Sequence, residues 1–116
     1  SYEAKYVDEN GAELLIPAPL DEETTDRIRS RAIEAYQALC CSGMARVDMF
    51  VNDDAILVNE INTIPGFTDI SMYPKLWEAT GISYTDLLTR LIELAIDRHR
   101  KKSNLKNEYP DRLSSP

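Results

Sequence analysis

Four polar side chains that could do chemistry interrupt two apolar segments of the chain, 44–51 and 56–62. They are Arg46, Asp48, Glu60 and Asn62. The segments have the length of strands, and Asn52-Asp53-Asp54-Ala55 between them is typical of a hairpin turn. Because side chains alternate between the two faces of a strand, each pair of polar residues is expected to share a face.

The register of this hairpin decides whether the two carboxylates meet. If residues 53–55 form the loop, Asp48 lies directly opposite Glu60. Directly opposed side chains have Cβ atoms about 4.5–5.5 Å apart, and like charges at that separation are destabilising. A two-residue loop would instead place Asp48 opposite Asn59. The first register predicts a pair of acids that needs a compensating cation.

Magnesium is the cation that these residues favour. Asn62 adds a neutral oxygen on the same expected face, and a few oxygen donors suit a hard ion that keeps several water ligands. Two alternatives stay open on the residues alone. In one, the strand face is simply solvated and Arg46 forms ion pairs with both acids. In the other, the carboxylates do acid–base chemistry, for which no second catalytic group stands out nearby.

Three motifs taken together resemble the D-alanine–D-alanine ligase family, which has the ATP-grasp fold. They are Arg46-Val47-Asp48, Glu60-Ile61-Asn62-Thr63-Ile64-Pro65-Gly66 and Ser71-Met72-Tyr73-Pro74. Glu3-Ala4-Lys5-Tyr6 also resembles the mobile active-site loop of that family, and the resemblance extends to about Arg100. The combination is specific, whereas an Arg-x-Asp motif alone carries little information.

The resemblance implies residues for the metal and for the reacting groups. Asp48, Glu60 and Asn62 match the ligands of two magnesium ions, for which manganese is a possible substitute. Arg46 matches the arginine that steadies the acyl phosphate and the tetrahedral intermediate. The backbone amide of Gly66 is expected to bind developing negative charge, as an oxyanion hole does.

Substrate-binding residues are implied in the same way. Ser71 and the amide of Met72 match the site for the carboxylate of the second substrate. Lys5 resembles the loop lysine that meets the ATP phosphates, and Tyr6 resembles the loop tyrosine of enzymes that add D-alanine. From the residues alone, Lys5 and Tyr6 would belong to a solvated loop and Ser71 would be a turn or cap residue.

The implied reaction joins two D-alanine molecules for peptidoglycan synthesis. ATP phosphorylates the carboxylate of one D-alanine, and the amino group of the second attacks the acyl phosphate to give D-alanyl-D-alanine. Metal ions offset the charge of the phosphate oxygens. A D-alanine–D-serine ligase, a non-catalytic cation-binding module and a purely structural domain are the alternatives.

Counterparts of the family's amino-terminal domain, its first D-alanine site and most of its adenine pocket are missing from these 116 residues. The chain is therefore expected to be inactive alone. It would act with the missing amino-terminal part of the same enzyme, as a homodimer when complete. Residues 1–102 would form the carboxy-terminal part of the ATP-grasp domain, with 1–10 in the mobile loop and 103–116 as a polar tail.

Local signals predict the elements that position these residues. Residues 1–18 are expected to be extended or loop, with a short strand at 14–16. Asp21 is a good N-cap for a first helix, which Gly43 would end. Pro74 can open a short helix ended by Gly81, and Ser83 can cap a last helix that runs to about residue 102. The fold class is α+β, with helices packed on a mostly antiparallel sheet.

Composition narrows the functional classes. The net charge of −7 argues against wrapping nucleic acid, which requires a basic surface. The adjacent Cys40 and Cys41 lack the spacing of a disulfide framework or a zinc site, and reduced thiols suit a cytoplasmic protein. The first residues show neither a signal peptide nor an initiating methionine, so a longer parent protein is expected. A compact domain of this size would bury roughly two-thirds of the surface of its unfolded chain.

Overall fold

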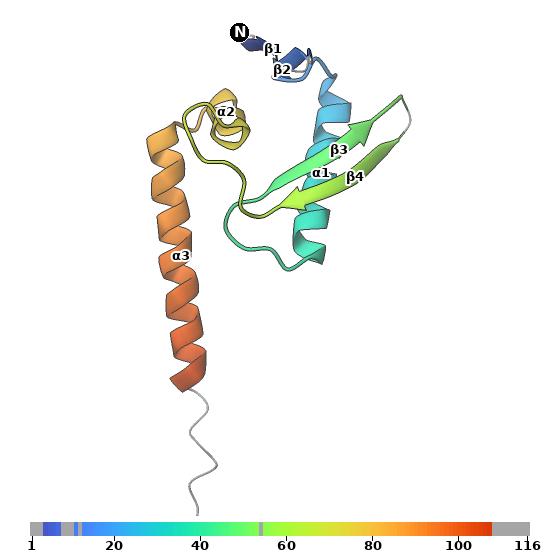
Figure 1. Cartoon of the computed structure of the whole chain (residues 1–116). Coiled ribbons are helices and arrows are strands. Elements are labelled where there is room, and N and C mark those ends of the chain that lie inside the picture. The colour runs from blue at the N-terminus through green and yellow to red at the C-terminus, as the bar shows by residue number, and fades with distance from the viewer. Residues whose placement is uncertain (1–3, 8–10, 12, 54, 108–116) are drawn as a thin grey trace, which may run out of the picture.

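Seven helices and strands occur within residues 4–7, 11, 13–53 and 55–107, the part of the chain that the computed structural model describes (Figure 1). In chain order they are β1 (Ala4–Val7), β2 (Glu13–Ile16), α1 (Glu22–Ala38), β3 (Arg46–Val51), β4 (Ile56–Asn62), α2 (Met72–Ala79) and α3 (Tyr84–Asn107). Side chains are described for residues 11, 13–53 and 55–105.

The strands form two separate antiparallel pairs. β1 pairs with β2, and β3 pairs with β4. The expected α+β class with antiparallel strands is confirmed. The start of the chain differs from the expectation, because the sequence predicts a strand only at 14–16, whereas Ala4–Val7 forms a second strand beside it.

Helix α1 begins where the sequence predicts. The side chain of Asp21 accepts a hydrogen bond from the backbone N–H of Thr24 at 2.7 Å, which is the N-cap interaction. Glu22 and Glu23 follow in the first turn, where the helix dipole favours negative charge.

The end of α1 is not where the sequence predicts, because Cys40 and not Gly43 ends it. The helix stops at Ala38, and Cys40 adopts a left-handed conformation with φ of 53°. The N–H of Cys40 bonds to the carbonyl of Gln37 at 3.0 Å, and that of Cys41 bonds to the carbonyl of Tyr36 at 3.1 Å. These two bonds form a Schellman motif, which usually has glycine at the left-handed position.

Helices α2 and α3 pack against each other, and local signals mark the end of α2 and the start of α3. α2 begins two residues before Pro74, and Gly81 ends it with φ of 96°. The N–H of Asp86 donates to the Ser83 hydroxyl at 3.1 Å, which confirms the predicted cap of α3. α3 continues to Asn107, past the expected end near residue 102. The division into 1–102 and a tail remains a prediction.

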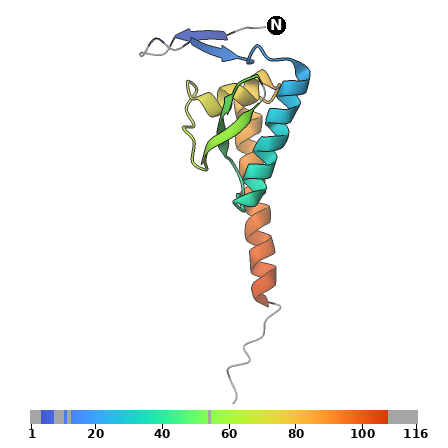
Figure 2. The ribbon, with the colours of Figure 1, turned by 90° about the vertical axis from the view of Figure 1, so that its right-hand side faces the viewer.

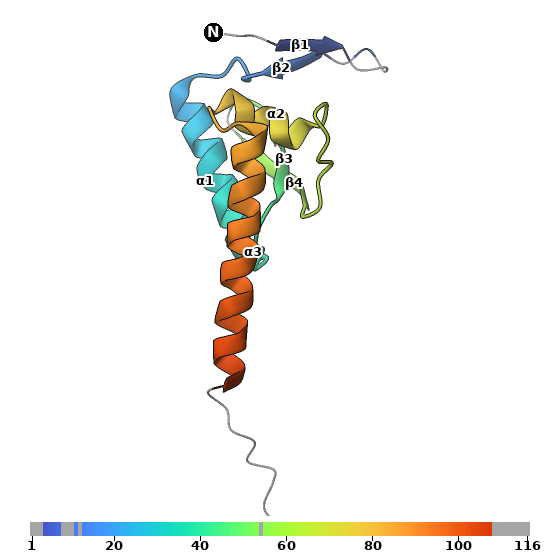
Figure 3. The ribbon, with the colours of Figure 1, turned by 90° about the vertical axis from the view of Figure 1, so that its left-hand side faces the viewer.

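The described part of the chain does not enclose a large core. The accessible surface of the chain is 9781 Å², which is about half of the roughly 19,000 Å² of an unfolded chain of this mass, so the expected two-thirds burial is wrong. Among the described residues, the buried hydrophobic side chains are Ile16, Tyr73 and Leu87. The carboxyl half of α3 extends past the other elements in three views (Figures 1, 2 and 3), which agrees with the exposure of Leu105.

Helix α1 lies across one face of the β3–β4 hairpin (Figure 1). Val47 and Ile61 are opposite each other in the ladder and half-buried. The alternation of side chains along a strand places Arg46 and Asp48 on the other face. The hairpin therefore holds its polar residues away from α1. No helix in the described part of the chain has the length and apolar character needed to cross a membrane.

Candidate active site

The β3–β4 turn is shorter than the predicted three-residue loop. Asn52 and Ala55 exchange two backbone hydrogen bonds, of 3.0 and 3.3 Å, so two residues remain in the loop. The register from Val51 opposite Ile56 to Met49 opposite Val58 follows from this turn. The expectation of a three-residue loop is therefore wrong.

A register shift nevertheless brings the two carboxylates together. The ladder shifts by one residue between Asp48 and Met49, and Asn59 is the extra residue of β4 that the pairing skips. Asp48 lies opposite Glu60 and Arg46 lies opposite Asn62, as the sequence predicts. Such a bulge re-aims the side chains beyond it. It puts Glu60 on the face that carries Asp48.

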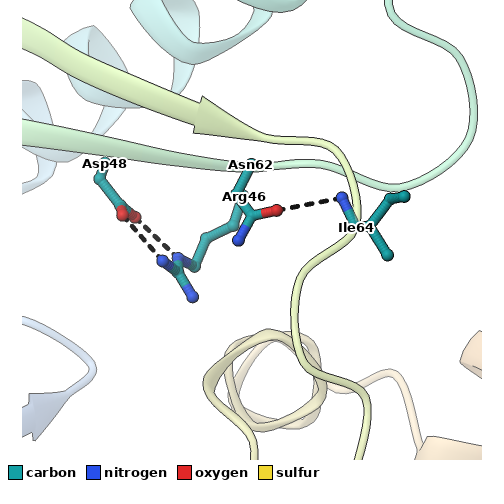
Figure 4. Close-up of polar contacts among 4 residues, drawn as sticks. All are labelled: Arg46, Asp48, Asn62 and Ile64. Carbon is teal, nitrogen blue, oxygen red and sulfur yellow. Dashed lines mark hydrogen bonds and ion pairs between the residues drawn. The ribbon is translucent and has the colours of Figure 1, made fainter.

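Arg46 and Asp48 form a two-pronged ion pair (Figure 4). Nε of Arg46 donates to Oδ1 of Asp48 at 2.8 Å, and Nη2 donates to Oδ2 at 2.9 Å. The two side chains are 27% and 34% exposed, so water screens the pair only partly. Fork-shaped pairs of this kind are among the stronger hydrogen bonds in proteins. The ion pair that the solvated-face alternative requires is therefore present for Asp48.

The same contacts shift the pKa of both groups. The hydrogen bonds from Arg46 lower the pKa of Asp48, burial opposes this, and the Arg46 charge and the Glu60 side chain lower it further. The hydrogen bond to Asp48 raises the pKa of Arg46, and the charges of Asp48 and Glu60 add to that effect against the cost of burial. Glu60 thus lies close enough to interact electrostatically with Arg46.

Asn62 links the hairpin to the loop that follows it. Its Oδ1 accepts a hydrogen bond from the backbone N–H of Ile64 at 3.1 Å (Figure 4). This bond orients the amide and fixes the direction in which the chain leaves β4.

Asp48, Glu60 and Asn62 offer oxygen atoms, the type of ligand that magnesium prefers. A carboxylate has about four lone-pair positions, so Asp48 keeps acceptor capacity after both bonds to Arg46. Asn62 keeps a second lone pair on Oδ1, and Glu60 is exposed. Within the described residues no group of three or more Asp, Glu, His or Cys side chains is placed to hold a metal. A divalent ion here would therefore complete its coordination with water or phosphate oxygens, as magnesium commonly does.

An aromatic cluster anchors the loop between β4 and α2. The ring of Phe67 lies 5.8 Å from that of Tyr73 and 5.4 Å from that of Tyr84. The Tyr84 hydroxyl donates to the backbone carbonyl of Phe67 at 2.9 Å. Tyr73 is buried, which raises its pKa, and its ring lies 6.3 Å from that of Trp77. Tyr73 packs inside this cluster, whereas Trp77 remains 37% exposed at its edge.

Ser71 stands at the N-cap position of α2, but its hydroxyl does not bond to its own helix. Its Oγ accepts a hydrogen bond from the N–H of Thr68 at 3.0 Å and lies 2.7 Å from Oγ1 of Thr68. A Cβ atom added to Gly66 would lie 3.0 Å from the same Oγ. Met72 is the first residue of α2. Gly66, Ser71 and Met72 therefore belong to one short segment.

The predicted residues thus lie in two groups. The hairpin group is Arg46, Asp48, Glu60 and Asn62, and the group before and at the start of α2 is Gly66, Ser71 and Met72. Asn62 connects the two groups through its hydrogen bond to the loop. Lys5 lies opposite Leu15, and Tyr6 lies opposite Leu14, in the β1–β2 ladder. Their side chains lie outside what the structure describes, as does Glu3. Sequence reasoning missed Thr68, whose spacing of three residues from Ser71 is typical of local hydroxyl–backbone motifs.

Known proteins resemble this chain over most of its length. Residues 1–93 match the family model described as D-ala D-ala ligase C-terminus. The chain is 57% identical over 107 residues to D-alanine–D-alanine ligase A of Salmonella typhimurium, covering 91% of this chain and 29% of that protein. It is 58% identical over 113 residues to the D-alanine–D-alanine ligase of Shouchella clausii, covering 97% and 31%.

Solved structures give the same result. The D-alanine–D-alanine ligase of Coxiella burnetii matches with a TM-score of 0.81 and 51% identity, over 87% of this chain and 29% of that one. The Bacillus anthracis ligase complexed with ATP matches with a TM-score of 0.71 and 37% identity, over 78% and 31%. The chain spans about 30% of the length of the relatives it matches. It belongs to the family of D-alanine–D-alanine ligase carboxy-terminal regions.

Proposed function

We propose that this chain supplies the magnesium site and the acceptor-carboxylate site of an ATP-dependent D-alanine–D-alanine ligase. The complete enzyme would join two D-alanine molecules through an acyl phosphate, in the cytoplasm, for peptidoglycan synthesis. The observation that supports this most is the pairing of Asp48 with Glu60 on the strand face that also carries Arg46.

The hairpin residues have distinct roles in this proposal. Asp48, Glu60 and Asn62 would hold two magnesium ions, which when bound neutralise phosphate charge during transfer. Arg46 would bind the acyl phosphate, because a guanidinium presents several donors to phosphate oxygens in a fixed geometry. Its bond to Asp48 keeps it on the reacting face of the hairpin.

The loop and α2 would bind the acceptor. The Ser71 hydroxyl and the Met72 amide would hold the carboxylate of the second D-alanine, and the helix dipole of α2 favours an anion there. The amide of Gly66 would donate to the oxyanion of the tetrahedral intermediate. Lys5 would meet the ATP phosphates, and Tyr6 would contact the amine acceptor.

The rest of the ligase would cover the apolar surface that this chain exposes. Its relatives are about three times as long, and large apolar side chains such as Ile92 on α3 and Phe50 on β3 are more than half exposed. Surfaces of this kind mark interfaces. The chain alone should therefore make no dipeptide, and the complete enzyme is expected to form a homodimer.

A chimeric enzyme tests the proposal. This chain would replace the matching carboxy-terminal region of the Salmonella typhimurium ligase A, to which it is 57% identical, and dipeptide formation from D-alanine and magnesium-ATP would be assayed. We expect activity in the chimera, and its loss on Asp48→Asn. Asp53→Asn, in the turn of the same hairpin, is the matched control and should retain activity.

The outcomes separate the alternatives. Dipeptide formation by the isolated 116 residues would contradict the need for a partner. An active Asp48→Asn chimera would contradict the metal-binding role of the hairpin. Faster ligation of D-serine than of D-alanine would identify a D-alanine–D-serine ligase. An inactive chimera that still binds manganese without nucleotide would support the non-catalytic cation-binding module.

A further inference from the structure

We propose that Thr68 is a positioning residue that makes the Ser71 hydroxyl a hydrogen-bond donor toward the carboxylate of the acceptor. The proposal rests on the proposed role of Ser71 in binding that carboxylate. It adds a residue that acts through Ser71 and does not itself touch the substrate.

Thr68 and Ser71 are joined by three contacts. The N–H of Thr68 donates to Ser71 Oγ at 3.0 Å, and the two hydroxyl oxygens are 2.7 Å apart. In return, the backbone N–H of Ser71 donates to the carbonyl of Thr68 at 3.0 Å. Together these contacts hold the Ser71 side chain in one orientation although it is only half-buried.

The donor and acceptor positions of the Ser71 hydroxyl determine which further hydrogen bonds it can form. A serine hydroxyl has one proton and two acceptor positions. The Thr68 N–H can only donate, so it occupies one acceptor position. A carboxylate can only accept, and it therefore draws the Ser71 proton. The second acceptor position of Ser71 is then left for the hydroxyl proton of Thr68. The hydrogen bond from Thr68 to Ser71 and the hydrogen bond from Ser71 to the carboxylate then strengthen each other.

The start of α2 supports this assignment. A serine at the N-cap normally accepts from an N–H in the first turn of its own helix. Ser71 has an extended N-cap backbone but makes no such bond, because its hydroxyl is directed at Thr68. Pro74, the third helical residue, has no N–H to offer. The hydroxyl therefore serves the loop and not the helix.

The close approach of Gly66 to Ser71 places the Thr68–Ser71 pair within the proposed site. A Cβ at Gly66 would lie 3.0 Å from Ser71 Oγ, so this hydroxyl rests almost against the Gly66 backbone. By fixing Ser71, Thr68 also fixes the distance between the acceptor carboxylate and the amide proposed for the oxyanion. A Ser71 hydroxyl that can only donate favours a carboxylate over a primary amide, whose NH₂ group would find no free acceptor position on Ser71.

The test uses the active chimera with Thr68→Val, which keeps the shape and the backbone N–H but removes the hydroxyl. We expect the KM for acceptor D-alanine to rise about tenfold, with kcat lowered much less and the KM for ATP unchanged. Thr68→Ser should restore the acceptor KM. Thr85→Val, an exposed threonine in the first turn of α3, is the matched control.

A double-mutant cycle shows whether Thr68 acts through Ser71. We expect Thr68→Val to have no further effect on the acceptor KM once Ser71→Ala is present. The discrimination between D-alanine and D-alaninamide as acceptors should also fall in Thr68→Val. Thermal unfolding of each variant checks that it is folded. The double-mutant cycle can still be interpreted if the unfolding midpoints of all variants shift by the same amount.

Three results would overturn the proposal. These are an unchanged acceptor KM in Thr68→Val, an equal rise in the KM for ATP, and additive effects of Thr68→Val and Ser71→Ala. If Ser71→Ala also leaves the acceptor KM unchanged, the proposed acceptor site fails as well. If Ser71→Ala raises it while Thr68→Val does not, only the role of Thr68 fails.

Discussion

Asp48 of β3 lies directly opposite Glu60 of β4 because Asn59 is an extra residue that shifts the ladder by one position. Without that shift, Asp48 would face Asn59, and Glu60 would point to the α1 side of the hairpin. Two like charges in opposed positions cost stability, which Arg46 offsets for Asp48. The hairpin thus keeps an electrostatic conflict that a divalent cation would relieve.

Glu60→Gln should weaken metal binding without destabilising the chain. Removing the charge opposite Asp48 relieves repulsion but also removes an attraction for Arg46, so the unfolding midpoint in EDTA should change by no more than a few degrees. Losing a carboxylate ligand should weaken manganese binding by about tenfold or more, measured by electron paramagnetic resonance. Glu78→Gln, an exposed acid on α2, should change neither quantity. A lower midpoint together with unchanged manganese affinity would contradict the paired-carboxylate site.

The Arg46–Asp48 pair should make stability depend on acid pH. Hydrogen bonds from Arg46 lower the pKa of Asp48 below its ordinary value of 3.8 in the folded chain. The pair therefore stabilises the fold at pH values above 3.8, and this contribution is lost as the pH falls through the lower folded-state pKa. In thermal unfolding from about pH 6 to pH 2.5, Asp48→Asn should lose less stability than the wild type. Identical pH profiles would show that the pair does not contribute.

Cys40→Gly should stabilise the chain. A residue with a side chain is strained at φ of 53°, by about 1 kcal/mol, and glycine is not. Cys40 is exposed, so its side chain gives up little packing when removed. The unfolding midpoint should rise by several degrees, whereas Cys40→Val should lower it, because a β-branched residue fits this conformation poorly. Cys40→Ser is the matched control and should behave like the wild type. A lower midpoint for Cys40→Gly would contradict the strain argument.

Gly66→Ala should destabilise the chain, mainly through a clash with the Ser71 hydroxyl. The new methyl carbon would lie 3.0 Å from Ser71 Oγ, which Thr68 holds in place. We expect a loss of about 1–2 kcal/mol in the free energy of unfolding, measured by urea titration. In a Ser71→Ala background the hydroxyl is gone and the Cβ at position 71 is 3.6 Å away, so the loss should be much smaller. Equal losses in both backgrounds would show that the clash lies elsewhere.

The amino-acid sequence alone predicted the features that depend on neighbours a few residues apart. Asp21 and Ser83 cap their helices through the N–H three residues later, and Gly81 ends α2 with a positive φ. The chemistry of the site was also visible in the sequence, because alternation along a strand puts Arg46 beside Asp48 whatever the rest of the chain does.

Only the tertiary structure decided the features that depend on contacts between segments. Two hairpin registers fit the same turn residues, and the sequence did not show that a two-residue turn and the bulge at Asn59 would combine to give the pairing of Asp48 with Glu60. A shift of one residue moves side chains to the other strand face, so packing of the apolar face against α1 selects the register. The left-handed Cys40 and the Thr68–Ser71 contact are local, but the structure was needed to show them, because glycine usually takes the left-handed position and an N-cap serine usually bonds to its own helix.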